Sequence, residues 1–190
     1  MDHPLETAGR YGGRLSPAVA AVAITAAILR SETFAWSTSA LSDLGTDPAT
    51  APLFNGGLVL AGLLALPLCA WRFDAARHRL ERVGALAFAG AMLALAGVGL
   101  FPSDTALHLP SAVGFYLGFT YGLFLTGTGE ALAGRRRRGL LTMWVGIAEL
   151  SVWLGWAALD TPGGLAVPET IGALVVVAWV VRTTRRRRGR

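Results

Sequence analysis

Long apolar segments alternate with short polar ones along almost the whole chain. Most of these segments approach the roughly 17–25 residues that a membrane-spanning helix needs. The first and the last are shorter, so we extend them to arginines, whose long side chains can reach the membrane interface. The pattern predicts an all-α, polytopic membrane protein of six transmembrane helices, at residues 15–30, 53–71, 83–101, 109–132, 139–159 and 167–181. A polar lead over residues 1–14 and a basic tail over 182–190 flank the helical domain at 15–181.

The composition supports a membrane protein rather than a soluble domain. Hydrophobic residues make up 53% of the 190 positions, and only 15% are charged, whereas soluble domains carry roughly 25% charged residues. Cys69 is the single cysteine, which excludes an internal disulfide and a cysteine-cluster metal site. We expect this thiol to be a small buried hydrophobe.

The positive charges lie on one side of the predicted membrane. All 17 basic residues are arginine, and strict alternation of the helices places every one except Arg30 on the same side. Because arginine in short loops stays cytoplasmic, we expect both termini inside the cell and the protein in the cell membrane. The basic tail is then a topology anchor with an attraction to anionic lipids, rather than a nucleic-acid site.

A signal peptide is the competing interpretation of the N-terminus, because two arginines precede the first apolar segment. The residues that follow this segment, 31–35, are a poor small-x-small cleavage site. We therefore expect an uncleaved first span.

Polar residues gather where the predicted helices meet the outer side. The longest connection, residues 31–52, contains Ser42 and Asp43 ahead of two prolines, and Asn55 lies one turn into the next helix. His108 and Glu169 stand at the start of two other helices that enter from this side. The outer carboxylates form an acidic rim opposed only by Arg30: Glu32, Asp43, Asp47, Asp104, Asp160 and Glu169.

His108 with Asp43 or Asp104 is a candidate catalytic set. Imidazole titrates near neutrality, so a histidine–aspartate pair can act as general acid and base. His108 and Asp104 are four residues apart and share a face if the helix begins early. A carboxylate–histidine group could also bind a divalent metal, although His108 is the only histidine near this side. The alternative is an interfacial histidine hydrogen-bonded to a loop aspartate, and the residues identify no cofactor.

Glu149 is a buried charge in the fifth predicted helix. It lies ten residues in from Gly139, which at 1.5 Å per residue is about 15 Å deep. A charge at that depth costs at least about 2.5–3.5 kcal/mol, so the carboxyl is hydrogen-bonded, protonated or functional. Thr25, Thr120 and Tyr121 are predicted at a comparable depth and are expected hydroxyl partners.

The fourth helix carries a stripe of small residues at Gly114, Gly118 and Gly122. Such spacing lets another helix approach closely. We assign the stripe to folding, with a homo-oligomer formed through this face as the rival interpretation. Glu130 continues the stripe and is expected to pair with an arginine of the 135–138 run.

Several segments resemble one membrane family. They are Phe34–Gly45, Leu53–Gly57, Gly97–Pro102 with His108, and Val167–Glu169. Together they resemble the archaeal and bacterial family named domain of unknown function 998, over nearly the whole chain. The Ser-Asp-x-Gly segment that starts at Ser42 is also similar, more distantly, to a six-span group of autophagy modulators and receptor-activating proteins.

The resemblance implies a six-helix membrane protein and carries no activity with it. It places five residues at motif positions: Ser42, Asp43, Asn55, His108 and Glu169. The distant group is tied to membrane trafficking and lipid remodelling, so a lipid-related role follows only by analogy.

The sequence therefore supports three hypotheses. The leading one is an outward polar pocket of Ser42, Asp43, Asn55, His108 and Glu169 that binds a lipid headgroup, a small ligand or a cation. The first alternative is an intramembrane lipid hydrolase or transferase, with or without a metal, that uses His108, Asp43 and Asp104. The second is a small proton-coupled transporter in which Glu149 titrates.

Overall fold

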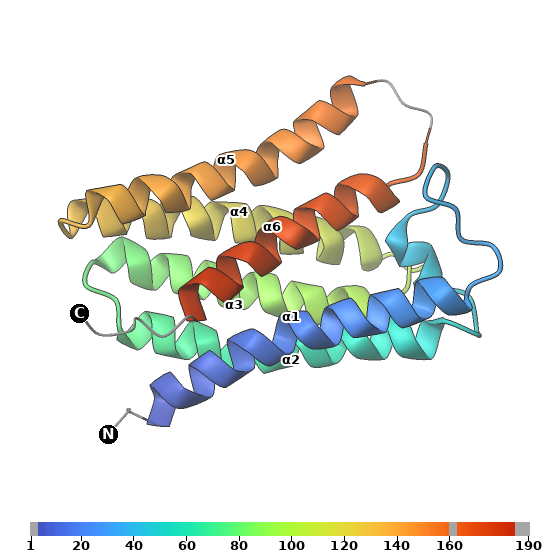
Figure 1. Cartoon of the computed structure of the whole chain (residues 1–190), viewed down its shortest axis with the longest axis horizontal. Helices are drawn as coiled ribbons and strands as arrows, with labels where there is room; N and C mark the ends of the chain where they lie inside the picture. Colours follow the sequence, from blue (N-terminus) through green and yellow to red (C-terminus); the bar gives the residue numbers. More distant parts are fainter. Residues whose placement is uncertain (1–3, 160–162, 185–190) are drawn as a thin grey trace.

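The computed structural model describes residues 4–159 and 163–184, which fold into six long α helices and one short 3-10 helix (Figure 1). No strand occurs in these two ranges, and all six α helices are long and apolar enough to cross a membrane. The prediction of an all-α, six-span membrane protein is confirmed. The elements are α1 (Pro4–Arg30), η1 (Leu41–Gly45), α2 (Ala51–Asp74), α3 (Arg79–Leu100), α4 (His108–Leu132), α5 (Arg136–Ala158) and α6 (Ala166–Thr184).

Helix α1 begins at Pro4 rather than at residue 15, so most of the predicted polar lead is helical. Gly9 and Gly12 are buried against α2, where a Cβ atom would meet Trp71 or the backbone of Leu64. These glycines let the first part of α1, which precedes the most apolar part of that helix, pack closely on α2. Pro17 consequently lies inside the helix.

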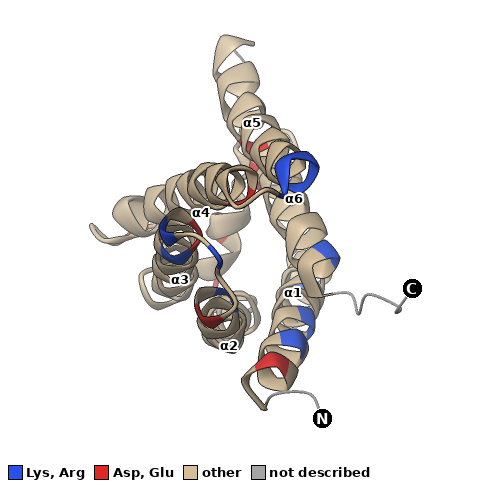
Figure 2. Cartoon of the chain, turned by 90° about the vertical axis from the view of Figure 1, so that its left-hand side faces the viewer, with Lys and Arg blue, Asp and Glu red and all other residues tan. Residues whose placement is uncertain are grey.

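The helices form a closed ring. Each helix packs against the next one in the chain, and α6 completes the ring by contacting both α5 and α1. Figure 2 shows α2, α3 and α4 on one side and α1, α6 and α5 on the other. Trp179 of α6 joins the two sides, because its ring packs edge-on against Phe88 and Phe119, with centroids 5.1 and 5.7 Å away.

The two ends of the ring differ in charge. One end, which we call the arginine end, holds the α2–α3 and α4–α5 connections together with Pro4 of α1 and Thr184 of α6 (Figures 1 and 2). The opposite end, the loop end, holds η1 and the α3–α4 connection. Residues 185–190 of the predicted tail and Asp160 of the predicted rim lie outside the described residues.

The glycine stripe of α4 packs within the chain. A Cβ atom on Gly118 would lie 3.3 Å from Cβ of Ala91, and one on Gly122 would lie 3.1 Å from the carbonyl oxygen of Gly84. Both neighbours belong to α3. The stripe therefore contributes to the packing of α4 on α3, and association of two copies through it stays a prediction.

Candidate functional site

Hydrogen bonds between the α1–α2 connection and the start of α6 hold the loop end together. The amide of Ala166 donates to the carbonyl of Ser39 at 2.9 Å, and the amide of Leu41 donates to Oε2 of Glu169 at 2.6 Å. Glu169 lies in the first turn of α6, where a carboxylate also interacts favourably with the helix dipole. These bonds fix Ser42, the next residue along, beside Glu169.

Two apolar cavities meet at this junction. The central cavity, of about 100 Å³, lies inside the ring. The lateral cavity, of about 350 Å³, lies between α4 and the second half of α5. Figure 1 shows this half of α5 leaning away from α4 towards the loop end. The walls of the lateral cavity are almost wholly apolar, and its lining includes Leu109, Val113, Leu117, Leu150 and Leu165.

Ser42, Tyr116 and Glu169 line both cavities and form the wall between them. The Tyr116 hydroxyl donates to the backbone carbonyl of Glu169 at 3.1 Å. Ser42 is only 7% exposed, and its hydroxyl makes no hydrogen bond to another described residue. We call these three residues, with His108, the polar wall.

The sequence did not identify Tyr116 as a candidate residue of the site. His108, Ala112, Tyr116 and Thr120 all line the lateral cavity and recur every four residues along α4. That spacing places them on one face of a helix. A polar stripe of one histidine, one tyrosine and one threonine on an apolar helix is the signal that would have found Tyr116.

His108 is the first residue of α4 and lies at the outer rim of the lateral cavity. Its Nδ1 atom lies 2.8 Å from the carbonyl oxygen of Phe101. A carbonyl can only accept, so Nδ1 carries the proton, and Nε2 of the neutral ring is an acceptor.

Asp43 and Asn55 line neither cavity, which corrects the expectation of one pocket built from all five motif residues. Oδ2 of Asp43 accepts from the amide of Ala40 at 2.8 Å, so its exposed carboxylate caps η1. Nδ2 of Asn55 donates to the carbonyl of Gly45 at 2.9 Å and ties η1 to α2. Both side chains hold the connection that carries Ser42.

Among the described residues, no hydrogen bond or ion pair joins His108 to Asp43 or to Asp104. Because α4 begins at His108, Asp104 lies in the preceding turn and is exposed, so the two do not share a helical face. Across residues 4–159 and 163–184, no three histidine, cysteine, aspartate or glutamate side chains are grouped to hold a metal ion. The hydrolase hypothesis therefore gains no geometric support.

Glu149 is fully buried beside the polar wall. Within the described ranges neither of its carboxyl oxygens has a hydrogen-bond partner. A Cβ atom on Gly172 would lie 2.9 Å from Oε1 of Glu149 and from the Tyr116 ring, so this glycine makes room for both side chains. The prediction of hydroxyl partners for Glu149 is wrong. Tyr121 is 66% exposed, and neither Thr25 nor Thr120 donates a hydrogen bond to the carboxyl group.

Hydrogen-bond acceptors dominate the polar wall. Oε2 of Glu169 accepts from Leu41, but Oε1 accepts from no described residue. Nε2 of His108 is a second acceptor when the ring is neutral, and the Ser42 hydroxyl can both donate and accept. The arrangement suits a headgroup that brings donors or a positive charge, with an apolar tail lying along α4.

Six long apolar helices in a ring, with a cavity that opens between two of them, define a multi-pass helical membrane protein. A model of the family described as "Protein of unknown function (DUF998)" matches residues 15–186, and the chain belongs to this family. No curated protein and no solved structure matches this chain. The more distant resemblance to autophagy modulators is not supported by these comparisons.

Proposed function

We propose that this protein binds a membrane lipid at the loop end, with the tail in the lateral cavity and the headgroup at the polar wall. The observation that carries the proposal is the polar wall itself. It places the unpaired Ser42 hydroxyl and Oε1 of Glu169 on a cavity that is otherwise apolar. Polar atoms that face an apolar cavity are stabilised by an occupant that pairs with them.

A lipid fits better than a water-soluble ligand for two reasons. The volume of about 350 Å³ falls within the roughly 300–1,000 Å³ typical of small-molecule sites. Large apolar side chains at the mouth of the cavity remain exposed, with Leu109 at 69% and Leu117 at 57%. On a membrane-spanning helix such side chains face hydrocarbon, so the occupant enters sideways from the bilayer.

A cavity-filling substitution tests the proposal. Leu117→Trp places a larger side chain in the lateral cavity, whereas Leu86→Trp changes a residue of similar exposure, 59%, on α3 that lines neither cavity. Native mass spectrometry of the purified proteins would count the retained lipid. We expect about tenfold less bound lipid in Leu117→Trp, a change of ~1.4 kcal/mol in binding, and no change in Leu86→Trp.

Equal lipid retention in the two variants would contradict the proposal. Both variants must first elute as single species in size-exclusion chromatography, which shows that they have folded. A lipid lost equally from both would mean that the binding reflects the general lipid-facing surface.

A proton-coupled carrier is a second candidate, favoured by one observation. Both oxygens of Glu149 are buried without a partner in the described part of the chain, and buried carboxyls inside membranes often relay protons. Proteoliposomes with a pH-sensitive dye inside would test it under an imposed membrane potential. A carrier predicts proton entry above empty liposomes that Glu149→Gln abolishes, whereas lipid binding alone predicts no such flux.

A further inference from the structure

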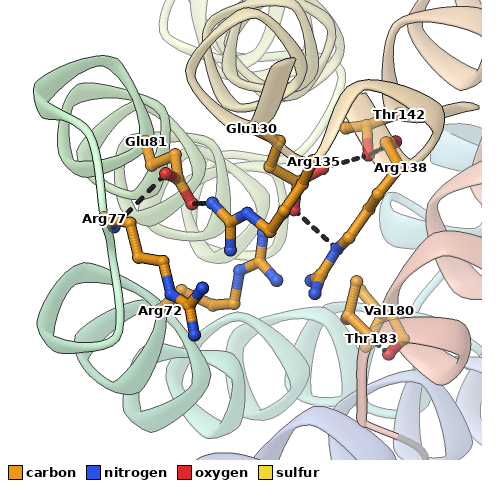
Figure 3. Close-up of polar contacts among 9 residues, drawn as sticks. All are labelled: Arg72, Arg77, Glu81, Glu130, Arg135, Arg138, Thr142, Val180 and Thr183. Atoms are coloured by element: carbon orange, nitrogen blue, oxygen red, sulfur yellow. Dashed lines mark hydrogen bonds and ion pairs between the residues drawn. The ribbon is translucent and has the colours of Figure 1, made fainter. Parts of the chain in front are cut away.

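A second polar cluster lies at the arginine end, far along the helices from the polar wall. It contains three arginines, Arg72 of α2 with Arg135 and Arg138 at the start of α5, and two glutamates, Glu81 of α3 and Glu130 of α4. Figure 3 shows these side chains gathered between the helix ends. We call this group the arginine cluster.

Glu130 is the centre of the cluster and is 1% exposed. Its Oε1 lies 2.7 Å from Nε of Arg138 in an ion pair and 3.6 Å from a terminal nitrogen of Arg72, while its Oε2 accepts a hydrogen bond from Thr142 at 2.9 Å. The expected pairing of Glu130 with the 135–138 run is therefore confirmed. The sequence did not predict Arg72, which is more than fifty residues away along the chain.

The cluster carries more positive than negative charge. Glu81 pairs with Arg135, and Glu130 is shared by Arg72 and Arg138 (Figure 3). Three guanidinium groups thus face two carboxylates, which leaves one positive charge without a counterpart among the described residues. A buried, uncompensated charge is costly, so an additional anion would stabilise this end.

Hydrogen-bond donors also remain unused. Nε of Arg135 is buried and has no partner in the described ranges. Arg72 donates no hydrogen bond to any described residue; its guanidinium instead stacks on the Trp179 ring, 5.4 Å from the centroid. Each guanidinium offers five N–H donors in a planar fork that matches phosphate oxygens.

The local backbone adds to the attraction for an anion. Gly134, at φ +81°, ends α4 in a Schellman turn, in which the amide of Arg135 donates to the carbonyl of Glu130 at 2.8 Å. This turn brings the first turn of α5, with its positive dipole end, over the cluster. A positive side chain at the start of a helix interacts unfavourably with the helix dipole. Stabilisation of α5 therefore does not explain why Arg135 and Arg138 lie there.

The arginine cluster is also reachable from outside. The exposed fraction of the side chain rises from 13% at Arg72 to 23% at Arg135 and 32% at Arg138. An anion approaching from the arginine end would meet Arg138 first and Arg72 last. The cluster is therefore partly desolvated but not closed.

We propose that the arginine cluster binds one phosphate group, which replaces the missing negative charge and bridges Arg72, Arg135 and Arg138. The shared chemistry is a phosphate monoester or diester, which an anionic lipid headgroup or a free phosphate ion can supply. This site is independent of the proposed lipid site at the loop end. It uses different residues and prefers the opposite charge.

The test uses the full-length protein stripped of lipid in detergent. In one arm, dioleoyl phosphatidylglycerol is added and counted by native mass spectrometry, with dioleoyl phosphatidylcholine as the neutral comparison. In the other arm, inorganic phosphate is titrated and binding is measured by calorimetry. Binding in the first arm alone identifies a lipid headgroup as the source, and binding in the second identifies the free anion.

The matched variants are Arg138→Gln and Arg137→Gln. They remove the same charge from adjacent residues, but Arg137 is exposed and makes no ion pair with the described residues. We expect the anion that binds in either arm to bind at least about tenfold more weakly to Arg138→Gln and unchanged to Arg137→Gln. Equal binding by the two variants, or no anion binding by the wild type in both arms, overturns the proposal.

Glu130→Gln provides a second check, made on protein that elutes as a single species in size-exclusion chromatography, because losing this carboxylate also destabilises the ion pairs of the cluster. This change removes the internal carboxylate that competes for Arg72 and Arg138. We expect severalfold tighter anion binding and a melting temperature that rises when the anion is added. Weaker binding than in the wild type would show that the cluster serves only to hold the helices together, which overturns the proposal.

Discussion

Glu130 and Glu149 are both fully buried, yet their surroundings are opposite. The carboxyl group of Glu130 lies near Arg72, Arg138 and Thr142. The carboxyl group of Glu149 lies near Gly172, beside the Tyr116 ring, and has no hydrogen-bond partner among the described residues. Removing one partner of a buried ion pair leaves uncompensated charge. A buried polar group without a hydrogen bond costs about 1–3 kcal/mol, and an apolar side chain of similar shape avoids that cost.

Methionine substitutions at these two positions should therefore have opposite effects. Glu149→Met should leave the apparent melting temperature in detergent unchanged or raise it. Glu130→Met should lower the stability by about 3–5 kcal/mol, because Arg72 and Arg138 lose their shared carboxylate. Thermal unfolding followed by circular dichroism would measure both, and a large loss of stability in Glu149→Met would contradict the unpaired state of that carboxyl.

Glu169 should select the headgroup at the polar wall. Glutamine at this position keeps an oxygen for the amide of Leu41 but loses the negative charge. Since hydrogen bonds to charged groups are worth about 1.5–3 kcal/mol, we expect Glu169→Gln to reduce the preference for phosphatidylethanolamine over phosphatidylglycerol by about tenfold. Native mass spectrometry with the two lipids in competition would measure this ratio.

The control for that ratio is Glu32→Gln, which removes an exposed carboxylate at the same end of the protein. It should leave the preference unchanged. If both variants shift the ratio equally, the selection comes from the overall charge of the loop end rather than from Glu169.

Among the elements, the turn between α4 and α5 depends most on a single residue. Gly134 has a positive φ of 81°, and its amide donates to the carbonyl of Ala131 at 3.1 Å within the Schellman turn. Side chains with a Cβ atom are disfavoured in this conformation. The same turn carries Arg135 over Glu81 and Arg138 over Glu130, so its geometry also determines the arginine cluster.

Gly134→Ala should destabilise the protein by about 1 kcal/mol, because alanine is strained at positive φ. Gly90→Ala is the matched control: Gly90 lies inside α3 with nothing within 4 Å of the added Cβ, and alanine favours a helix by roughly 0.5–1 kcal/mol. The melting temperature should fall in the first variant and rise slightly in the second. A fall of the same size in both would contradict the role of the turn.

At the scale of the whole molecule, charge asymmetry predicts the orientation in the membrane. Basic residues gather at the arginine end (Figure 2), whereas Arg30 is the only arginine of the described residues at the loop end, where Glu32, Asp43 and Asp104 are exposed. Because arginine-rich connections stay cytoplasmic, we expect the loop end, with its polar wall, to face outwards.

Single cysteines would test this orientation. In a Cys69→Ala background, Ser103→Cys at the loop end should react with a membrane-impermeant maleimide added to intact cells. Arg137→Cys at the arginine end should react only after the cells are opened. Both residues are exposed, so the reverse pattern of labelling would show the opposite orientation.

The local sequence was enough to predict the helices, because a span is defined by its own apolar length. The local sequence also predicted that most arginines lie at one end of the helices and that Ser42, His108 and Glu169 lie at the other. Each of these residues lies near a helix terminus, and the hydrophobic pattern alone places that terminus at this end of the protein. The start of α1 was missed because its first part is held by glycine packing on α2 rather than by hydrophobicity.

Only the tertiary structure decided which of these residues meet. Asp43 and Asn55 hold η1 from outside the two cavities, while Tyr116 joined Ser42 and Glu169 across three elements. Arg72 and Arg138 share one carboxylate although α2 and α5 are not neighbours in the chain. The apolar pattern specifies the depth and the end of each residue, but the rotation and contacts of a helix depend on how all six pack together.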